Sequence, residues 1–317
     1  MISFSVIIVT YNHASYLEER IASVMAQTYP HFEVIFIDDA STDGSQEIIE
    51  RYRQHEKVSH LLLNKTNNGY QSRNWQQAMQ LAANDWVWIA EGDDIADPHF
   101  LEKAAQALAN EDSALFYTDA YKLEEGKAKS ESLLYSNIKD TFFQTLHWSS
   151  NYWEDGKMEV DVFHKYVCIV NNVSAAVIPK KAALEMLANF PHKRFYSDWL
   201  FFAQLMERLP VRYLAEPLTG YRSYLESHFG KAGNGLAKRV ECFEVLQYFC
   251  SQPYITSKNE LVKFFTEQYL GFGLWQQAAW LLPLTKQFFK RNPRLAMRVF
   301  LHLLAIKVTR KKINYIF

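Results

Sequence analysis

The first hundred residues alternate apolar, β-branched runs with segments of helical periodicity. Ser5–Val9 and Glu33–Ile37 are nearly continuous apolar runs, as is typical of parallel strands buried on both faces. Val58–Leu63 and Trp86–Ala90 are two further predicted strands. The predicted helices that separate the four strands cover residues 16–25, 46–54 and 73–83. This alternation predicts an α/β fold with a mostly parallel central sheet flanked by helices.

Polar or acidic segments follow three of these predicted strands. Residues 10–12 (Thr-Tyr-Asn) follow the first strand, residues 38–39 (Asp-Asp) the second, and residues 91–94 (Glu-Gly-Asp-Asp) the fourth. In sheets of this kind, ligands bind beyond the carboxyl ends of the strands. We therefore expect the three segments to line one edge of the sheet and to form a ligand site there.

The third segment places the carboxylates of Glu91, Asp93 and Asp94 within four positions. Adjacent carboxylates repel one another unless a cation or solvent relieves the repulsion. Their oxygens suit Mg²⁺ or Mn²⁺, which often use one or two carboxylates together with substrate phosphates. Gly92 leaves room for a ligand close to the backbone. The alternative interpretation is a solvated turn that caps the next helix, which would begin at His99.

The other two segments favour a nucleotide. Asp39 can accept hydrogen bonds from a base or a ribose, and Tyr11 offers a ring for stacking. No GxGxxG follows a predicted strand, and no GxxxxGK[ST] occurs in the sequence, so neither common glycine-rich phosphate loop is present. A bound diphosphate would therefore need a metal ion and basic side chains, for which Arg73 is a candidate.

Four segments together resemble the family 2 glycosyltransferases of the GT-A fold. They are residues 5–12 (SVIIVTYN), 38–45 (DDASTDGS), 68–74 (NGYQSRN) and 91–98 (EGDDIADP). They occur in the order and spacing of that family between about residues 3 and 100. The resemblance implies a nucleotide-diphospho-sugar donor and a transfer that inverts the anomeric centre.

The resemblance also implies roles for residues of the donor site. Thr10, Tyr11 and Asn12 match the segment that lines the base and the ribose, with the tyrosine stacked on the base. Asp39 matches the acid that accepts the ring N–H of the base, which favours uracil. Arg73 matches an arginine near the donor phosphates.

Residues 91–93 match the DXD motif of the family. The resemblance implies that Asp93 is the direct ligand of Mn²⁺ or Mg²⁺, with Glu91 and Asp94 as further candidate ligands and Gly92 as part of the donor site. The sequence departs from the usual motif at Glu91, where aspartate is commoner. Glutamate keeps the charge and extends the reach of the side chain, so its contact could be metal, ribose or water.

Asp198 matches the position of the catalytic base, at the start of a predicted helix about a hundred residues after the acidic cluster. The family commonly has Glu-Asp there, whereas this chain has Ser197-Asp198. An acid flanked by aromatic residues loses solvation, which raises its pKa towards a useful value. The alternative is a helix-capping aspartate. Further on, Arg222 and His228 are candidates to hold the leaving diphosphate, although His228 lies farther along the chain than the corresponding histidine usually does.

The net charge of −1 conceals two oppositely charged parts. Nine of the 34 Lys and Arg residues follow Leu284, and no Asp or Glu follows Glu267, so residues 1–283 carry −10 and residues 284–317 carry +9. Apolar residues are interspersed with these basic residues, which suits a helix lying on an anionic membrane surface. The alternative is a helical cap packed on the catalytic domain. We do not expect nucleic acid as a partner, because no binding module accompanies the charge.

These observations predict three parts. Residues 1–222 form a GT-A catalytic domain, with a donor-binding half over 1–100 and an acceptor half over 101–222. Residues 223–283 form a helical extension, and residues 284–317 form a basic amphipathic tail that associates with membrane. No apolar run reaches the ~20 residues of a membrane-spanning helix, and the N-terminus lacks the basic start of a signal peptide. We therefore expect a cytoplasmic enzyme bound peripherally to the inner face of the cytoplasmic membrane.

The predicted function is transfer of a sugar from a nucleotide-diphosphate donor, with UDP favoured, to a hydroxyl of an acceptor glycan. The acceptor is expected to be a lipid-linked glycan in the synthesis of a surface polysaccharide. Two alternatives remain. One is a GT-A-like sugar nucleotidyltransferase, which usually has a glycine-rich basic loop that Thr10–Ser15 lacks. The other is a non-catalytic module that binds sugar nucleotides.

Overall fold

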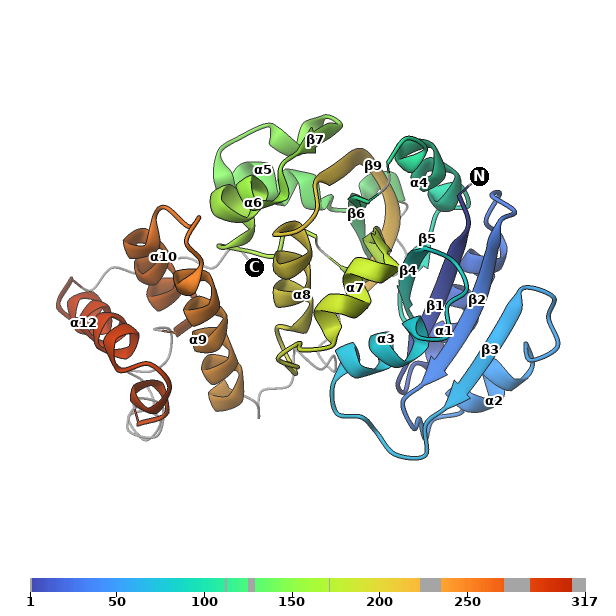
Figure 1. Cartoon of the computed structure of the whole chain (residues 1–317), viewed down its shortest axis with the longest axis horizontal. Helices are drawn as coiled ribbons and strands as arrows, with labels where there is room; N and C mark the ends of the chain where they lie inside the picture. Colours follow the sequence, from blue (N-terminus) through green and yellow to red (C-terminus); the bar gives the residue numbers. More distant parts are fainter. Residues whose placement is uncertain are drawn as a thin grey trace. The chain divides into compact units, whose positions relative to one another are not determined.

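The structure, a computed structural model, describes residues 2–111, 113–124, 129–170, 172–222, 235–270 and 286–309. The chain divides into two compact units (Figure 1). Unit 1 comprises Met1–Glu159 and Cys168–Ser223, and unit 2 comprises Val160–Val167 and Tyr224–Phe317. The predicted donor site and the predicted base lie in unit 1. The predicted separation of residues 223–317 into an extension and a tail stays a prediction.

In the described residues, unit 1 is built on one sheet in which eight strands have the order β3-β2-β1-β4-β8-β6-β9-β5. The ninth strand, β7, pairs with β9. The first four strands are β1 (Phe4–Thr10), β2 (Phe32–Asp38), β3 (Val58–Leu63) and β4 (Trp86–Glu91), and they are parallel to one another. This arrangement confirms the predicted α/β fold with a mostly parallel sheet.

The second half of the sheet is mixed. β8 (Ala176–Pro179) runs antiparallel to both β4 and β6 (Leu115–Leu123), and β9 (Val211–Arg222) runs parallel to β6. The short strands β5 (Ile95–Ala96) and β7 (Tyr152–Glu154) run antiparallel to β9.

One strand is longer than the sequence indicates. The apolar pattern predicts a strand over Val211–Leu214, but β9 continues to Arg222. Pro217 interrupts the pattern because proline cannot donate to a ladder. A register shift in β6 at Thr118–Ala120 accommodates the irregularity.

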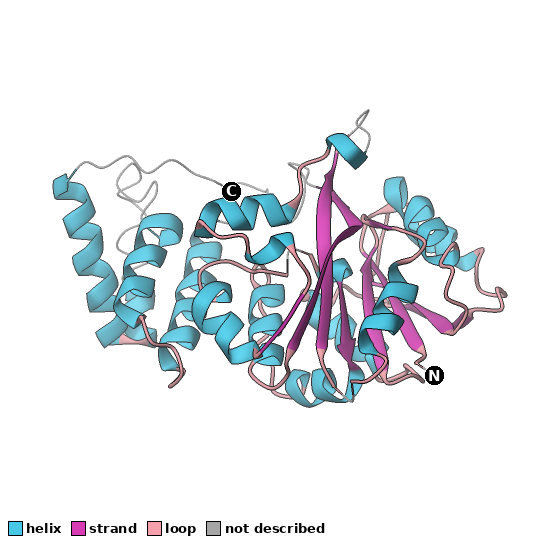
Figure 2. Ribbon diagram, turned by 90° about the horizontal axis from the view of Figure 1, so that it is seen from above, coloured by secondary structure: helices cyan, strands magenta, loops and turns pink. Residues whose placement is uncertain are grey.

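Helices cover both faces of the sheet (Figure 2). In α1 (Ala14–Met25), Leu17, Ile21 and Val24 are buried at helical spacing against apolar side chains of β1, β2 and β4. The remaining helices of unit 1 are α2 (Ser45–Glu50), α3 (Gln71–Met79), α4 (Phe100–Leu108), α5 (Tyr135–Phe143), α6 (Gly156–Glu159), α7 (Lys180–Leu187) and α8 (Ser197–Met206).

Unit 2 is helical, as predicted for the C-terminal region. Its main helices are α9 (Gly235–Ser251), α10 (Lys258–Phe265) and α12 (Pro293–Thr309). Phe243 of α9 stacks on Phe288 with ring centres 4.0 Å apart. Leu295 and Val299 of α12 are buried. No helix in the described part of the chain combines the length and apolar character needed to cross a membrane.

Candidate active site

The three polar segments lie at the same edge of the sheet, because β1 runs between β2 and β4 (Figure 1). In the register of these strands, Thr10 lies opposite Asp38 and Val9 lies opposite Glu91. The expected convergence of residues 10–12, 38–39 and 91–94 is therefore present in the structure. It follows from pairing alone, since neighbouring strands lie only ~5 Å apart.

Hydrogen bonds join the loop after β1 to the loop after β2. Asn12 has a left-handed backbone, with φ of 56°, and its Oδ1 accepts a bond from Thr42 N at 2.9 Å. Asn12 N donates to Ser41 Oγ at 2.9 Å, and Ala14 N donates to Asp43 Oδ2 at 2.8 Å. These contacts fix the backbone on both sides of Tyr11, which is 46% exposed. An exposed ring on a fixed backbone is suited to stacking on a planar ligand.

Asp39 joins the loop after β2 to the loop after β3. Its Oδ1 accepts bonds from Asn68 N at 2.8 Å and from Asn64 Nδ2 at 3.1 Å. Asp39 N donates to the carbonyl oxygen of Thr10 at 3.0 Å. The carboxylate is therefore held in one orientation. Sequence reasoning missed the role of Asn64, and only its place directly after the predicted strand pointed to it.

Glu91 turns inward from the edge of the sheet. Its two carboxylate oxygens accept bonds from Gln71 Nε2 at 2.9 Å and from Trp75 Nε1 at 3.1 Å, both on α3. Burial, followed by the charges of Asp93 and Asp94, raises the pKa of Glu91 to about 8. Both oxygens thus have protein partners. Glu91 therefore joins residues 91–94, called the acidic turn below, to α3.

Arg20 lies behind the acidic turn, and sequence reasoning missed it. It is fully buried on α1, and its guanidinium lies 5.0 Å from the centre of the Trp88 ring. Burial lowers the pKa of Arg20 to about 10, against the opposing effect of Asp94 and Asp93. Burial and Asp93 raise the pKa of Asp94 to about 7, while Arg20 acts to lower it. The only sequence signal was a basic residue three positions after Leu17 on the apolar stripe.

Asp93 is the least buried acid of the turn, with 19% of its side chain exposed. His13 Nε2 lies 3.9 Å from Asp93 Oδ2, and sequence reasoning missed this histidine. A Cβ on Gly92 would lie 2.8 Å from His13 Nδ1 and 3.0 Å from the carbonyl oxygen of Val9. Packing alone therefore requires glycine at this position.

Asp198 lies in the first turn of α8, as expected. It is partly exposed, and its Oδ1 accepts a bond from Trp199 N at 2.8 Å. Burial of the carboxyl raises its pKa above the usual value, with the backbone bonds acting in the opposite direction. The proposed base is thus an acid of raised basicity at a helix start.

Contacts between α3 and α8 link the predicted base to the predicted donor site. Ser72 Oγ of α3 lies 2.9 Å from His192 Nδ1 and 3.4 Å from Ser197 Oγ. Trp75 of α3 packs edge-on against Phe201 of α8, with ring centres 5.1 Å apart. Because Trp75 also donates to Glu91, one helix touches both the acidic turn and the helix of Asp198.

Three basic residues, Arg73, Arg222 and His228, were predicted to lie near the donor phosphates. Arg73 Nη1 donates to the carbonyl oxygen of Asn68 at 3.2 Å, and its guanidinium lies 4.8 Å from the ring of Tyr70. Arg222 Nη1 donates to the carbonyl oxygen of Asp93 at 2.6 Å. Arg73 thus lies beside the loop after β3, and Arg222 lies beside the loop after β4. His228 lies outside the described residues.

The arrangement combines the exposed ring of Tyr11, the oriented carboxylate of Asp39 and the acidic turn. It also includes the carboxyl of Asp198 on α8. Among the described residues, no group of three or more His, Cys, Asp or Glu side chains forms a complete metal site. A cation held here would therefore take part of its ligands from a bound substrate or from water.

The central sheet flanked by helices has the GT-A fold of the nucleotide-diphospho-sugar transferases. The solved structure of residues 1–349 of S. aureus TarS in complex with UDP matches with a TM-score of 0.65 at 15% identity, over 99% of this chain and 93% of that one, which shows the fold. The family described as "Glycosyl transferase family 2" matches residues 5–164. The chain belongs to that family.

Two relatives match part of this chain. One is TuaG of Bacillus subtilis, named as a teichuronic acid biosynthesis glycosyltransferase, at 30% identity over 45% of this chain. The other is TarS of Staphylococcus aureus, named as a poly(ribitol-phosphate) β-N-acetylglucosaminyltransferase, at 37% identity over 33% of this chain. The matched parts span 59% of TuaG and 18% of TarS.

Proposed function

We propose that this protein transfers a sugar from a UDP-sugar to a hydroxyl of an acceptor glycan and inverts the anomeric centre. The observation that carries the proposal is the convergence of Tyr11, Asp39 and Asp93 at one sheet edge, with α3 joining that edge to the helix of Asp198. Family membership makes sugar transfer the first choice for such a site.

The uracil base is proposed to stack on Tyr11 while its ring N–H donates to the carboxylate of Asp39. Thr10 and Asn12 frame the ribose, and Arg73 lies towards the phosphates. The fixed orientation of Asp39 supports this assignment, because a pre-oriented acceptor discriminates between base edges. A solved TarS structure is described as a complex with UDP, which favours the same nucleotide here.

The donor set fits Mg²⁺ or Mn²⁺ held through one carboxylate. Asp93 is the least buried acid of the turn, whereas the oxygens of Glu91 bond to α3 and Asp94 is buried near Arg20. We therefore propose Asp93 as the direct ligand, with Glu91 and Asp94 shaping the turn. A bound cation would neutralise charge that develops on the departing diphosphate.

Asp198 is proposed as the general base. Its carboxylate accepts the proton of the acceptor hydroxyl while the acceptor oxygen forms a bond to the anomeric carbon. The bond from that carbon to the diphosphate oxygen breaks on the opposite face, and UDP leaves. Burial raises the pKa of Asp198, which makes the ionised form a stronger base.

The acceptor is proposed to be a lipid-linked glycan in surface polysaccharide synthesis, reached by peripheral binding to the inner face of the cytoplasmic membrane. The names of TuaG and TarS, both of cell-surface polymers, support this class of acceptor. In α12, Leu295 and Val299 are buried in unit 2, while Met297 and Leu301 are 47% and 57% exposed beside the exposed Arg294. An exposed apolar stripe with a basic neighbour suits an anionic membrane surface.

The proposal is tested by a panel of sugar nucleotides with Mn²⁺, measured first by thermal shift and then by donor consumption. A ligand that binds only the folded state raises the melting temperature. We expect UDP-sugars to stabilise the protein more than GDP-sugars, and one UDP-sugar to be consumed with release of UDP. Formation of a sugar nucleotide from UTP and a sugar phosphate would favour a nucleotidyltransferase, and donor binding without turnover would favour a non-catalytic module.

A further inference from the structure

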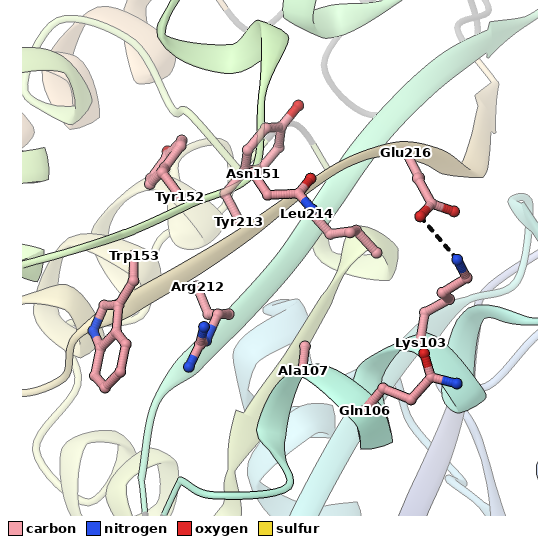
Figure 3. A pocket seen from close by; sticks show the side chains of 10 residues that line it. All are labelled: Lys103, Gln106, Ala107, Asn151, Tyr152, Trp153, Arg212, Tyr213, Leu214 and Glu216. Atoms are coloured by element: carbon pink, nitrogen blue, oxygen red, sulfur yellow. Dashed lines mark hydrogen bonds and ion pairs between the residues drawn. The ribbon is translucent and has the colours of Figure 1, made fainter.

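A pocket of about 540 Å³ lies on unit 1 between α4, β7 and β9 (Figure 3). Its volume is within the usual range for small-molecule sites. The lining contains both aromatic and polar side chains. The side chains that matter here are Lys103, Gln106, Asn151, Trp153, Arg212 and Glu216.

The pocket lies far from the proposed donor site. β4 and β6 both run antiparallel to β8, and β9 runs parallel to β6, so β4 and β9 point the same way. Glu91 and Arg222 end these two strands at the donor edge, whereas Arg212 lies near the start of β9. At ~3.3 Å per residue, roughly 30 Å of strand separate Arg212 from Arg222.

Trp153 forms an exposed, oriented ring on one side of this pocket. It is 54% exposed, and the guanidinium of Arg212 lies 4.5 Å from the centre of its ring. Trp153 also pairs with Arg212 in the β7–β9 ladder, which fixes the backbone beneath the ring. Figure 3 shows the indole and Arg212 side by side at one end of the pocket. A large aromatic ring exposed on a fixed backbone beside a pocket is available to pack against a ligand.

The charges at this pocket are paired. Lys103 Nζ lies 2.9 Å from Glu216 Oε1, and Arg212 pairs with Glu111. Asn151 Oδ1 accepts a bond from Ala215 N at 2.8 Å, which orients its amide group. With each cation matched by a carboxylate, the pocket favours an uncharged ligand that offers many hydroxyls over a phosphate or a uronate.

We propose that this pocket binds a neutral pyranose unit of a glycan chain. The apolar face of the sugar lies against Trp153, and its hydroxyls bond to Gln106, Asn151 and the Lys103–Glu216 pair. Such a site would hold a glycan near the start of β9, at the end of the strands opposite the proposed donor site. The inference does not depend on the proposed transfer reaction, because binding here needs neither donor nor metal.

The test uses cellotetraose and chitotetraose as neutral probes and tetragalacturonate as an anionic probe. Binding to the full chain, without donor or metal, is followed by saturation-transfer NMR. We expect a millimolar dissociation constant for at least one neutral probe and at least a tenfold weaker one for Trp153→Ala. Trp153→Phe keeps a ring and is expected to retain most of the binding. Leu146→Ala, at a residue 78% exposed, is the control and should bind as the parent does.

Equal binding by Trp153→Ala and the parent chain would overturn the proposal. So would failure of both neutral probes at millimolar concentration, or tighter binding of the anionic probe. The outcome is separable from the transfer reaction: Asp198→Asn should lose transfer and keep probe binding. A chain that transfers sugar without binding the probes overturns only the pocket, and one that binds them without transfer overturns only the proposed function.

Discussion

Arg222, the last residue of β9, donates a hydrogen bond of 2.6 Å from Nη1 to the carbonyl oxygen of Asp93. Its Nη2 pairs with Glu19 of α1, and its guanidinium lies 4.6 Å from the ring of Tyr16. Two segments 129 positions apart in the sequence are thereby joined at the acidic turn. Arg222 thus positions the backbone that carries the proposed metal ligand.

Arg222→Ala is expected to weaken Mn²⁺-dependent binding of UDP about fivefold. The reason is that one hydrogen bond to the turn, worth about 1 kcal/mol, no longer holds Asp93 in place. Isothermal titration of UDP with Mn²⁺ measures the change. Glu19→Gln is the matched control, since it removes only the 56% exposed partner of Arg222 and should change affinity little. Unchanged affinity in Arg222→Ala would contradict the positioning role.

Asp198→Asn is expected to lower kcat by about 10²–10⁴-fold and leave the affinity for UDP unchanged, because the amide cannot accept the acceptor proton. Single-turnover transfer and a UDP titration measure the two quantities. Since burial raises the pKa of Asp198 and only the ionised form acts as base, kcat/KM should rise with pH through that raised pKa and then level. Turnover close to that of the parent in Asp198→Asn would reject the assignment.

Asp93→Asn is expected to abolish the gain in UDP affinity that Mn²⁺ gives the parent chain, because a neutral amide is a poor ligand for a hard cation. Thermal shifts with UDP, with and without Mn²⁺, measure the effect. Asp97→Asn is the control, since Asp97 bonds to His99 and Lys129 instead. The metal assignment is wrong if Mn²⁺ raises the melting temperature of Asp93→Asn as much as that of the parent.

Arg20→Met is expected to destabilise the fold more at pH 8 than at pH 5. The pKa of Asp94 is raised to about 7, so Asp94 is largely neutral at pH 5 and ionised at pH 8. At pH 8 the ionised Asp94 depends on the charge of Arg20, and one pH unit above its pKa this dependence is worth about 1.4 kcal/mol. Melting temperatures of variant and parent at both pH values measure the difference. An equal loss at both would show that Arg20 acts only through packing on Trp88.

The raised pKa values of Glu91 and Asp94 also make the stability of the parent chain depend on pH. A carboxyl whose pKa is higher in the folded state stabilises the fold below its unfolded pKa, and this contribution is lost as pH rises through the folded pKa. The folded pKa values are about 8 for Glu91 and about 7 for Asp94. Ionisation of these two groups should therefore make the melting temperature fall as the pH rises from about 4 to 8. Glu91→Gln and Asp94→Asn should each flatten the profile.

Substituting both Met297 and Leu301 with Glu is expected to reduce co-sedimentation of the full chain with phosphatidylglycerol vesicles. The change puts acidic groups on the exposed stripe of α12, while the buried Leu295 and Val299 stay intact. Leu146→Glu adds a charge at another exposed apolar residue and should leave sedimentation unchanged. Equal sedimentation of the double variant and the parent would remove the membrane proposal.

The sequence predicted the four strands of residues 1–100 well because their signals are local. Buried parallel strands are apolar along their whole length, so Ser5–Val9 and Trp86–Ala90 were recognisable without any tertiary contact. Their parallel direction then followed from alternation with helices, and the polar strand ends identified the edge where the three polar segments meet. β9 was predicted less well, because Pro217 and Gly220 break its pattern and its partners lie far away in the sequence.

By itself the sequence determined the fold class, the family and the polar segments that meet at one edge of the sheet. Only the tertiary structure decided how three adjacent acids differ: Glu91 bonds to α3, Asp94 lies buried near Arg20, and Asp93 stays partly exposed. It also placed Trp153 beside Arg212 in the pocket near the start of β9. The physical reason is that strand formation depends on local periodicity, whereas solvation, charge and hydrogen-bond partners depend on neighbours that only the folded chain brings together.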